Sequence, residues 1–255
     1  MGERMNLQYR DRSHAGAVLA GLLGDYARRD DVLVLGLPRG GVPVAYQVAG
    51  ALGAPLDVFL VRKLGVPGRE ELAMGAIASG GVRVVSHDIL HELDIPMAAV
   101  DAVAAREGQE LERRERLYRG GRSMPSLKGC TVMLVDDGLA TGATMEAAVL
   151  AVRQHEPARI VVAVPVGAPD TCERLRRVAD DVVCVFAPAS FRAVGSWYEC
   201  FDQTSDAEVI DSLSRSAAAA RAQHDDADGH RQQRAGDRVD DVVIAADDTA
   251  DRNRH

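Results

Sequence analysis

Three runs of consecutive apolar residues constrain the fold of this chain more than any other feature. They lie at Val32–Leu37, Cys130–Val135 and Arg159–Val164 and are rich in β-branched side chains. Within each run the apolar residues are continuous and do not alternate with polar ones, which is typical of strands covered on both faces. The sequence therefore predicts a sheet that is buried on both sides.

Segments with helical patterning separate these runs. Candidate helices cover about His14–Arg28, Val42–Leu52, Met97–Arg119, Thr144–His155 and Asp170–Ala179. Further candidate strands lie at Pro55–Val61, Asp181–Phe186 and, as an edge or hairpin strand, Val82–Ser86. Alternation of strand and helix predicts right-handed crossovers and an open, mainly parallel α/β sheet with helices on both faces. Ligands of such sheets bind beyond the carboxyl ends of the strands, so we expect the chemistry in the loops that follow them.

Composition narrows the classes of function. The chain has 255 residues, of which 47% are hydrophobic, and a formal net charge of -8. An acidic balance argues against direct nucleic-acid binding and against a surface that lies on anionic lipid. The sequence has no signal-peptide core and no apolar run of roughly 20 residues, so we expect a soluble cytoplasmic protein. The four cysteines form no C-x-x-C pair, which signals neither a zinc site nor a disulfide framework.

The composition changes near residue 216. Beyond it the chain consists mainly of Ala, Asp, Arg, Gln and His, with few large apolar residues. Such a segment buries too little surface to offset its ordering entropy. We therefore expect one domain over residues 1–215 and a disordered tail over residues 216–255.

Two adjacent acids, Asp136 and Asp137, follow the second apolar run directly. Paired carboxylates at the end of a buried strand are costly unless hydroxyl groups, a cation or solvent satisfy them. An ionised carboxylate only accepts hydrogen bonds, so the diol of a sugar would supply complementary donors. The structural alternative is an Asx-turn and helix cap after the strand.

The residues after this acidic pair suit a phosphate group. Gly138 turns the chain, and the segment that leads into the next helix consists of Ala140, Thr141, Gly142, Ala143 and Thr144. Small residues let backbone N–H groups approach an anion closely, and a helix N-terminus adds partial positive charge. The two threonine hydroxyls can donate to the same phosphate. Acids and phosphate loop together predict a pocket for a phosphorylated ribose.

The order of these features resembles the 5-phosphoribosyl 1-pyrophosphate (PRPP) signature of type I phosphoribosyltransferases: an apolar strand, Asp-Asp, a short spacer, Ala-Thr-Gly-x-Thr and a helix. The resemblance implies that Asp136 and Asp137 hold the ribose hydroxyls and act on a magnesium ion indirectly, together with PRPP. It implies that Ala140–Thr144 wrap the 5′-phosphate. It extends from about Asn6 to Val209 and implies the fold of that family, with a flexible loop over the site.

A second candidate loop follows the first apolar run. Arg39, Gly40 and Gly41 come after Pro38, and the two glycines allow close backbone contact with an anion to which Arg39 adds a fixed charge. The segment is similar to the pyrophosphate loop of the family, and this implies that these three residues bind pyrophosphate. A plain turn is the alternative interpretation of Pro-Arg-Gly-Gly alone.

A third segment, Val61–Ala76, is punctuated by Gly65, Pro67 and Gly68, and we expect a mobile loop that excludes water from the site. Family members carry a flexible loop at this place. Lys63 is the candidate for a catalytic charge on the pyrophosphate, and Glu71 is a weaker candidate for acceptor binding. An ordinary solvated loop explains the charged residues of the segment about as well.

Aromatic residues gather near the end of the candidate domain, in a chain that is only 4% aromatic. Trp197 and Tyr198 are candidates for stacking on a flat acceptor, because an aromatic face accepts other π-systems. Packing of this segment in the core is the alternative.

The resemblance implies an enzyme that transfers the phosphoribosyl group of magnesium-bound PRPP to a nitrogen acceptor, a nucleobase by preference, and releases pyrophosphate. Lys63, Asp136 and Asp137 are the catalytic candidates, and the expected partners are PRPP and a small-molecule acceptor, with a homodimer as the assembly to test. Ala140 stands where enzymes for hypoxanthine or guanine typically carry an acid, but the acceptor stays open. The alternatives are a non-catalytic sensor of PRPP or nucleotides and a protein-interaction module.

Overall fold

The structure is a computed structural model that describes residues 8–222. The chain divides into two units, Met1–Ser216 and Ala217–His255. All of the elements described next belong to the first, except a last helix that continues past Ser216. Within residues 8–222, no helix combines the length and the apolar character needed to cross a bilayer.

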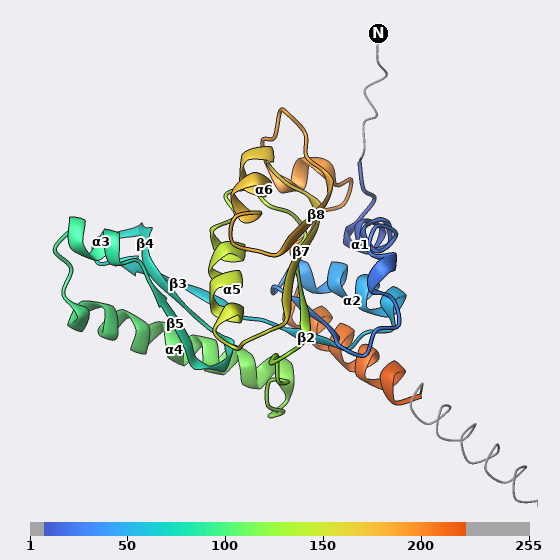
Figure 1. The fold of residues 1–255 in the computed structure, drawn as a ribbon, viewed down its shortest axis with the longest axis horizontal. Helices are drawn as coiled ribbons and strands as arrows, with labels where there is room; N and C mark the ends of the chain where they lie inside the picture. The colour runs from blue at the N-terminus through green and yellow to red at the C-terminus, as the bar shows by residue number, and fades with distance from the viewer. Residues whose placement is uncertain (1–7, 223–255) are drawn as a thin grey trace, which may run out of the picture. The chain divides into compact units, whose positions relative to one another are not determined.

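A five-stranded parallel sheet forms the centre of the first unit (Figure 1). Its strands, in the order β2-β1-β6-β7-β8, are Leu56–Val58, Val32–Gly36, Thr131–Val135, Arg159–Val166 and Asp181–Phe186. In the register of the central strands, Leu35 lies opposite Leu134, and Leu134 lies opposite Val162. The three apolar runs are therefore neighbouring strands, and the predicted mainly parallel α/β sheet is confirmed.

Helices cover both faces of this sheet, as Figure 1 shows. On one face, α5 (Ala143–Arg153) and α6 (Pro169–Leu175) pack on alternate strand residues such as Leu134 and Val162. On the other face, α1 (Arg12–Ala20) and α2 (Gly41–Leu52) pack on the intervening residues, such as Met133 and Val161. Because both pleat faces are buried, the strands need apolar residues at every position, which explains the continuous runs.

The elements begin and end within a few residues of their expected bounds, with two helices shorter than expected. The helix expected over His14–Arg28 ends at Ala20 and is followed by a 3-10 turn at Gly24–Tyr26. The helix expected to reach Ala179 ends at Leu175. Pro55–Val61 is divided between β2 and the start of the next strand, β3.

The segment Val61–Ala76, expected as a loop, is a β-hairpin. β3 (Val61–Val66), β4 (Arg69–Ala78) and β5 (Val82–Val85) form an antiparallel three-stranded sheet, which also confirms a hairpin strand near Val82. Gly68, at φ +77°, serves the turn between β3 and β4. Leu64, Val66 and Met74 are buried against α3 (His87–Glu92) and α4 (Met97–Arg119). The Gly-Pro-Gly punctuation thus marks an irregular hairpin with register shifts, and apolar burial holds it in place.

A helix over residues 206–222 follows the sheet, so the chain is still helical at Ser216, where we expected the tail to begin. Its residues Val209 and Leu213 are buried in a cluster with Val42, Val58 and Tyr118. Leu213 is the last buried residue of the described chain. The prediction of disorder beyond residue 222 falls outside the described residues.

This distribution of burial predicts the outcome of two truncations. A chain that ends at Ser216 keeps Val209 and Leu213 and should melt within a few degrees of the full chain. A chain that ends at Thr204 loses both side chains, each worth about 1.5–3 kcal/mol on burial, and should melt at a clearly lower temperature. Differential scanning calorimetry of the three chains measures this. A large drop in the melting temperature of the Ser216 truncation would contradict the prediction.

Candidate functional site

The acidic pair lies at the carboxyl end of β6, the middle strand of the parallel sheet. Asp136 and Asp137 are both half-buried, and the backbone N–H of Asp137 donates to Oδ1 of Asp136 over 2.9 Å. Burial raises the pKa of Asp136 well above its usual range, and the neighbouring charge of Asp137 raises it further. Burial also raises the pKa of Asp137, although Arg12 opposes that shift. Such a pair favours a ligand that brings hydrogen-bond donors or positive charge.

Arg12 is part of this site, and no local pattern in the sequence pointed to it. Its Nε donates to Oδ2 of Asp137 over 2.8 Å, and its Nη1 donates to the carbonyl of Asp202 over 2.6 Å. Its guanidinium carbon lies 4.0 Å from the centre of the Phe201 ring. Arg12 therefore joins three segments that are distant in sequence: the start of α1, the acidic pair and the segment after β8.

Tyr198 has a different place from the expected one. Its side chain is only 4% exposed and packs in a cluster with Tyr9, so neither ring face is open to a flat acceptor. Its hydroxyl donates to the backbone carbonyl of Asp137 over 2.6 Å. The prediction that Tyr198 stacks on the acceptor is wrong, and the alternative of core packing holds for this residue. Through this hydrogen bond Tyr198 helps to fix the backbone of the acidic pair.

Trp197 is half-buried and packs edge-to-face on Phe186, with 5.1 Å between the ring centres. Its indole Nε1 is buried and has no hydrogen-bond partner among residues 8–222. The structure therefore places Trp197 against the last residue of β8. Its role toward an acceptor stays a prediction.

The glycine loop after β1 lies directly against the acidic pair. A Cβ on Gly40 would lie 2.0 Å from Oδ2 of Asp137, and a Cβ on Gly41 would lie 2.6 Å from the carbonyl oxygen of Val135 and 2.9 Å from Oδ1 of Asp136. No side chain fits at either position, so glycine is required for this close approach. The sequence-predicted acids and glycines thus belong to one site.

Arg39 follows a cis peptide bond from Pro38 and stands at the edge of this loop. Its guanidinium Nη1 lies 3.9 Å from Oδ1 of Asp206, which starts the helix over residues 206–222. The side chain of Arg39 is 32% exposed. A long, half-exposed ion pair of this kind contributes little to stability, so an anionic ligand can compete for the arginine.

The phosphate loop leads from the acidic pair into α5. Gly142 takes the left-handed conformation at φ +70°, whereas Ala143 is already helical, so the positive φ falls on the residue that tolerates it. Ala140, Thr141 and Thr144 are exposed. No side chain caps the N-terminus of α5. The first amides of a helix without such a cap, together with two exposed hydroxyls, can bind a phosphate.

Helix α6 fixes this loop from behind. The hydroxyl of Thr171 donates to the carbonyl of Ala140 over 2.7 Å, and a Cβ on Gly142 would lie 2.4 Å from the Thr171 methyl group. The guanidinium of Arg174 donates to the carbonyl of Thr141 and to Glu146. No local pattern in the sequence pointed to Thr171 or Arg174, although their position after β7, the neighbour of β6, places them at the same edge of the sheet.

Lys63 lies on β3 and lines a cavity of about 510 Å³ between the hairpin sheet and α5. Ala143 and Thr144 of the phosphate loop line the same cavity, together with apolar residues such as Val84 and Leu150. The structure therefore brings Lys63 to the phosphate loop. Glu71 lies in β4, but its side chain is outside the part of the chain that the structure describes.

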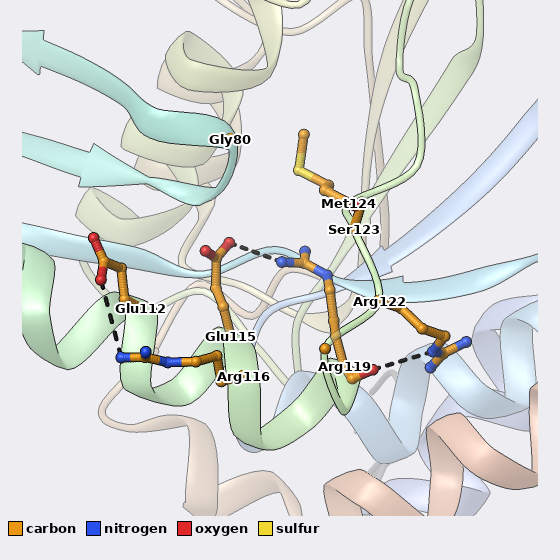
Figure 2. A pocket seen from close by; sticks show the side chains of 9 residues that line it. Gly80, Glu112, Glu115, Arg116, Arg119, Arg122, Ser123 and Met124 are labelled. Carbon is orange, nitrogen blue, oxygen red and sulfur yellow. Dashed lines mark hydrogen bonds and ion pairs between the residues drawn. The ribbon is translucent and has the colours of Figure 1, made fainter.

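A second pocket, of about 370 Å³, lies at the end of α4 and contains none of the predicted site residues (Figure 2). Its most buried charge, Arg119, contacts Glu115 over 2.7 Å, Asp57 over 3.1 Å and the carbonyl of Val58 over 2.7 Å. Glu115 and Arg119 point toward each other in Figure 2. This network joins α4 to β2. Because its charges are paired within the protein, it offers less to a ligand than the site at β6.

The carboxylates of the site limit the ways in which it could hold a magnesium ion. Within residues 8–222 no group of three or more His, Cys, Asp or Glu residues could hold a metal ion. Two adjacent carboxylates suit Mg²⁺ only when a substrate supplies further oxygen ligands, which is its common mode of binding in phosphate sites. Asp136 and Asp137 therefore fit a magnesium ion that arrives with a phosphorylated substrate.

Comparisons with known proteins identify the family of this chain. The family of the phosphoribosyl transferase domain matches residues 67–195. Two curated relatives from Mycobacterium tuberculosis, strains H37Rv and CDC 1551, are provisionally named phosphoribosyl transferases. Each is 49% identical over 205 residues, which is 80% of this chain and 46% of the relative. The chain thus spans about half the length of these curated relatives.

A solved structure gives a further match. The crystal structure of TT1426 from Thermus thermophilus is 46% identical in sequence, with a TM-score of 0.74, over 81% of this chain and 97% of that chain. The acidic pair and the phosphate loop lie inside the segment that the family matches, whereas the glycine loop and Lys63 precede it. The expected fold and family are confirmed. This chain belongs to the phosphoribosyl transferase domain family.

Proposed function

We propose that this domain binds PRPP together with magnesium and transfers its phosphoribosyl group to a nitrogen acceptor of the nucleobase class, with release of pyrophosphate. The observation that carries the proposal is the contact between the glycine loop and the acidic pair. It joins an anion-binding backbone, two carboxylates and, a few residues later, the N-terminus of α5 in a continuous site. A ribose that bears a phosphate at one end and a pyrophosphate at the other has this distribution of groups.

Each group of residues is assigned to one part of PRPP. The exposed hydroxyls of Thr141 and Thr144 and the first amides of α5 bind the 5′-phosphate. Asp136 and Asp137 accept hydrogen bonds from the ribose hydroxyls and stabilise positive charge that develops on the ribose ring. The Gly40–Gly41 backbone and Arg39 bind the departing pyrophosphate. Because Arg12 and Tyr198 hold Asp137 from two sides, the acids are oriented before the substrate arrives.

A bound magnesium ion would neutralise charge on the pyrophosphate as it leaves. Asp136 and Asp137 are the residues that would hold it, through PRPP. Lys63 lines the cavity beside the phosphate loop and adds a positive charge there. The hairpin that carries Lys63 takes the place of the expected mobile loop, and we propose that it limits access of water to the site. A cytoplasmic location and a homodimer remain predictions.

Pyrophosphate release from PRPP with a panel of nucleobases tests the proposal. Magnesium-dependent turnover with one base class supports the transferase and identifies the acceptor. Binding of PRPP without turnover for any base would favour the non-catalytic sensor, and absence of both would favour the protein-interaction module.

The assignment of the acidic pair has a direct test in Asp137→Asn. The amide keeps the size of the side chain but removes the negative charge that accepts ribose hydroxyls. We expect magnesium-PRPP affinity in calorimetry to fall about ten- to a hundredfold, the cost of losing hydrogen bonds to a charged group. Asp211→Asn, an exposed acid on the helix over residues 206–222, is the matched control and should bind normally. Equal affinity of both variants would remove Asp137 from the site.

The raised pKa of Asp136 predicts a gain in stability from its neutralisation. A carboxyl whose pKa is higher in the folded state binds its proton more tightly there, so folding stability falls as the pH rises from the usual Asp value toward the raised one. Asp136→Asn removes this penalty and keeps an oxygen for the N–H of Asp137. At pH 7 the variant should melt at a higher temperature than the wild type, because its free energy of unfolding should be greater by about 1.4 kcal/mol for each unit by which the pKa is raised. It should nevertheless bind PRPP poorly.

Thermal melting from pH 3 to pH 8 measures this difference, which should vanish below a pH of about 4, where both states are protonated. Asp137→Asn should stabilise less than Asp136→Asn, because it also removes the ion-pair partner of Arg12. A melting temperature of Asp136→Asn that stays at or below that of the wild type at pH 7 would show that the pair is not strained in the unliganded protein.

A further inference from the structure

Two cysteine thiols lie together behind the phosphate loop. Cys172 is on α6 and is 1% exposed, and Cys184 is on β8 and is half-buried. Both sulfur atoms adjoin Gly167: a Cβ there would lie 2.7 Å from Sγ of Cys172 and 3.4 Å from Sγ of Cys184. Both cysteines are free thiols. Neither belongs to the ligand site proposed above.

This thiol pair is connected to the phosphate loop through short contacts. Thr171, the residue before Cys172, donates from its hydroxyl to Ala140 and packs against Gly142. On the other side, Gly167 forms a β-bridge with Leu139, and the N–H of Leu139 donates to the carbonyl of Val166 over 2.9 Å. A displacement of α6 relative to β8 would therefore reach the loop from two sides.

The two sulfurs differ in their chemistry. A hydrogen bond with Cys184 lowers the pKa of the Cys172 thiol to about 7, against the opposing effect of burial, and the positive charge of Arg176 adds to the lowering. The pKa of Cys184 is raised by its contact with Cys172 and by burial. Its S–H can also donate to the carbonyl of Phe186, 3.3 Å away. One sulfur is thus the stronger nucleophile, and the other is held beside it in protonated form.

We propose that Cys172 and Cys184 form a reversible disulfide when the protein meets a peroxide, and that this bond alters the phosphate loop at Ala140–Thr144. The effect on PRPP binding rests on the proposed function, whereas the bond and the change in the loop do not. No sequence motif signals this pair, because the two residues are 12 positions apart and only the crossover from α6 to β8 brings them together.

The chemistry balances with hydrogen peroxide as the oxidant. The Cys172 thiolate attacks one peroxide oxygen, the O–O bond breaks, and hydroxide leaves, which gives a sulfenic acid on Cys172. The Cys184 sulfur then attacks the Cys172 sulfur as its own proton leaves, the S–O bond breaks, and the hydroxide departs as water. Two thiols are oxidised by two electrons, the peroxide is reduced to two waters, and a thiol reductant reverses the reaction.

Formation of the bond should move α6. A disulfide requires an S–S distance of about 2.05 Å and a defined torsion, so two free thiols must approach each other before the bond can form. Cys172 shares a short helix with Thr171 and Arg174, which both hold carbonyls of the phosphate loop. We therefore expect weaker contacts at Ala140 and Thr141 and faster exchange of the loop amides in the oxidised protein.

The experiment uses the 255-residue chain with Cys130→Ser and Cys200→Ser, so that Cys172 and Cys184 are its only cysteines. Peroxide treatment is followed by intact-mass measurement, hydrogen exchange of the peptide over residues 139–146, and calorimetry with magnesium-PRPP. We expect the loss of two hydrogen masses, faster exchange, and PRPP affinity reduced about tenfold, all restored by dithiothreitol. The same protein with the additional change Cys184→Ser should show no disulfide and no reversible change in exchange.

The outcomes separate the two proposals. If both thiols stay reduced, or if the disulfide forms and the exchange of residues 139–146 is unchanged, the inference is wrong. If the reduced protein does not bind PRPP, the proposed function fails, and the mass and exchange measurements still decide the inference. A bulky aromatic disulfide reagent provides a check on the assignment: in the folded wild type it should react with the exposed Cys200 and leave the buried Cys172 intact.

Discussion

The site depends on the contact between a backbone without side chains and two carboxylates. Gly40 and Gly41 approach Asp136 and Asp137 so closely that a single methyl group at either glycine would collide with the acids or their backbone. This contact joins the loop after β1 to the loop after β6, and these two strands are neighbours in the sheet. The parallel topology therefore supplies the geometry, and glycine makes the distance possible.

The sequence predicted those parts of the structure that local patterns encode. The continuous apolar runs correspond to β1, β6 and β7, because burial of both sheet faces leaves no polar alternation. Asp136, Asp137 and the glycines were found because unusual residues stand together at strand ends. The hairpin of β3 and β4 was misjudged, since its turn residues are those of a loop, and its burial depends on α3 and α4, which come later in the chain.

Residues that act through long-range contacts had no such signal. Arg12 reaches Asp137 across 125 positions, and Tyr198 reaches the same residue across 61. A lone arginine near the N-terminus resembles any solvated charge in sequence, and an aromatic residue near the end of a domain suits a ligand platform as well as a core. Only the packing of the segment after β8 against α1 distinguishes these possibilities, because it places Phe201 under Arg12 and buries Tyr198.

The acidic pair and the phosphate loop are held in place by different interactions. Asp136 and Asp137 are held together at an electrostatic cost, because burial raises the pKa of both carboxyls and Arg12 offsets only part of that rise. A ligand that brings hydroxyl donors and a cation would relieve that cost. The phosphate loop next to them is held by Thr171 and Arg174, which donate to its carbonyls. The geometry of the loop Ala140–Thr144 is therefore set by α6, whereas that of the acidic pair is set by α1 and the sheet. The two halves of the candidate site thus depend on different parts of the fold.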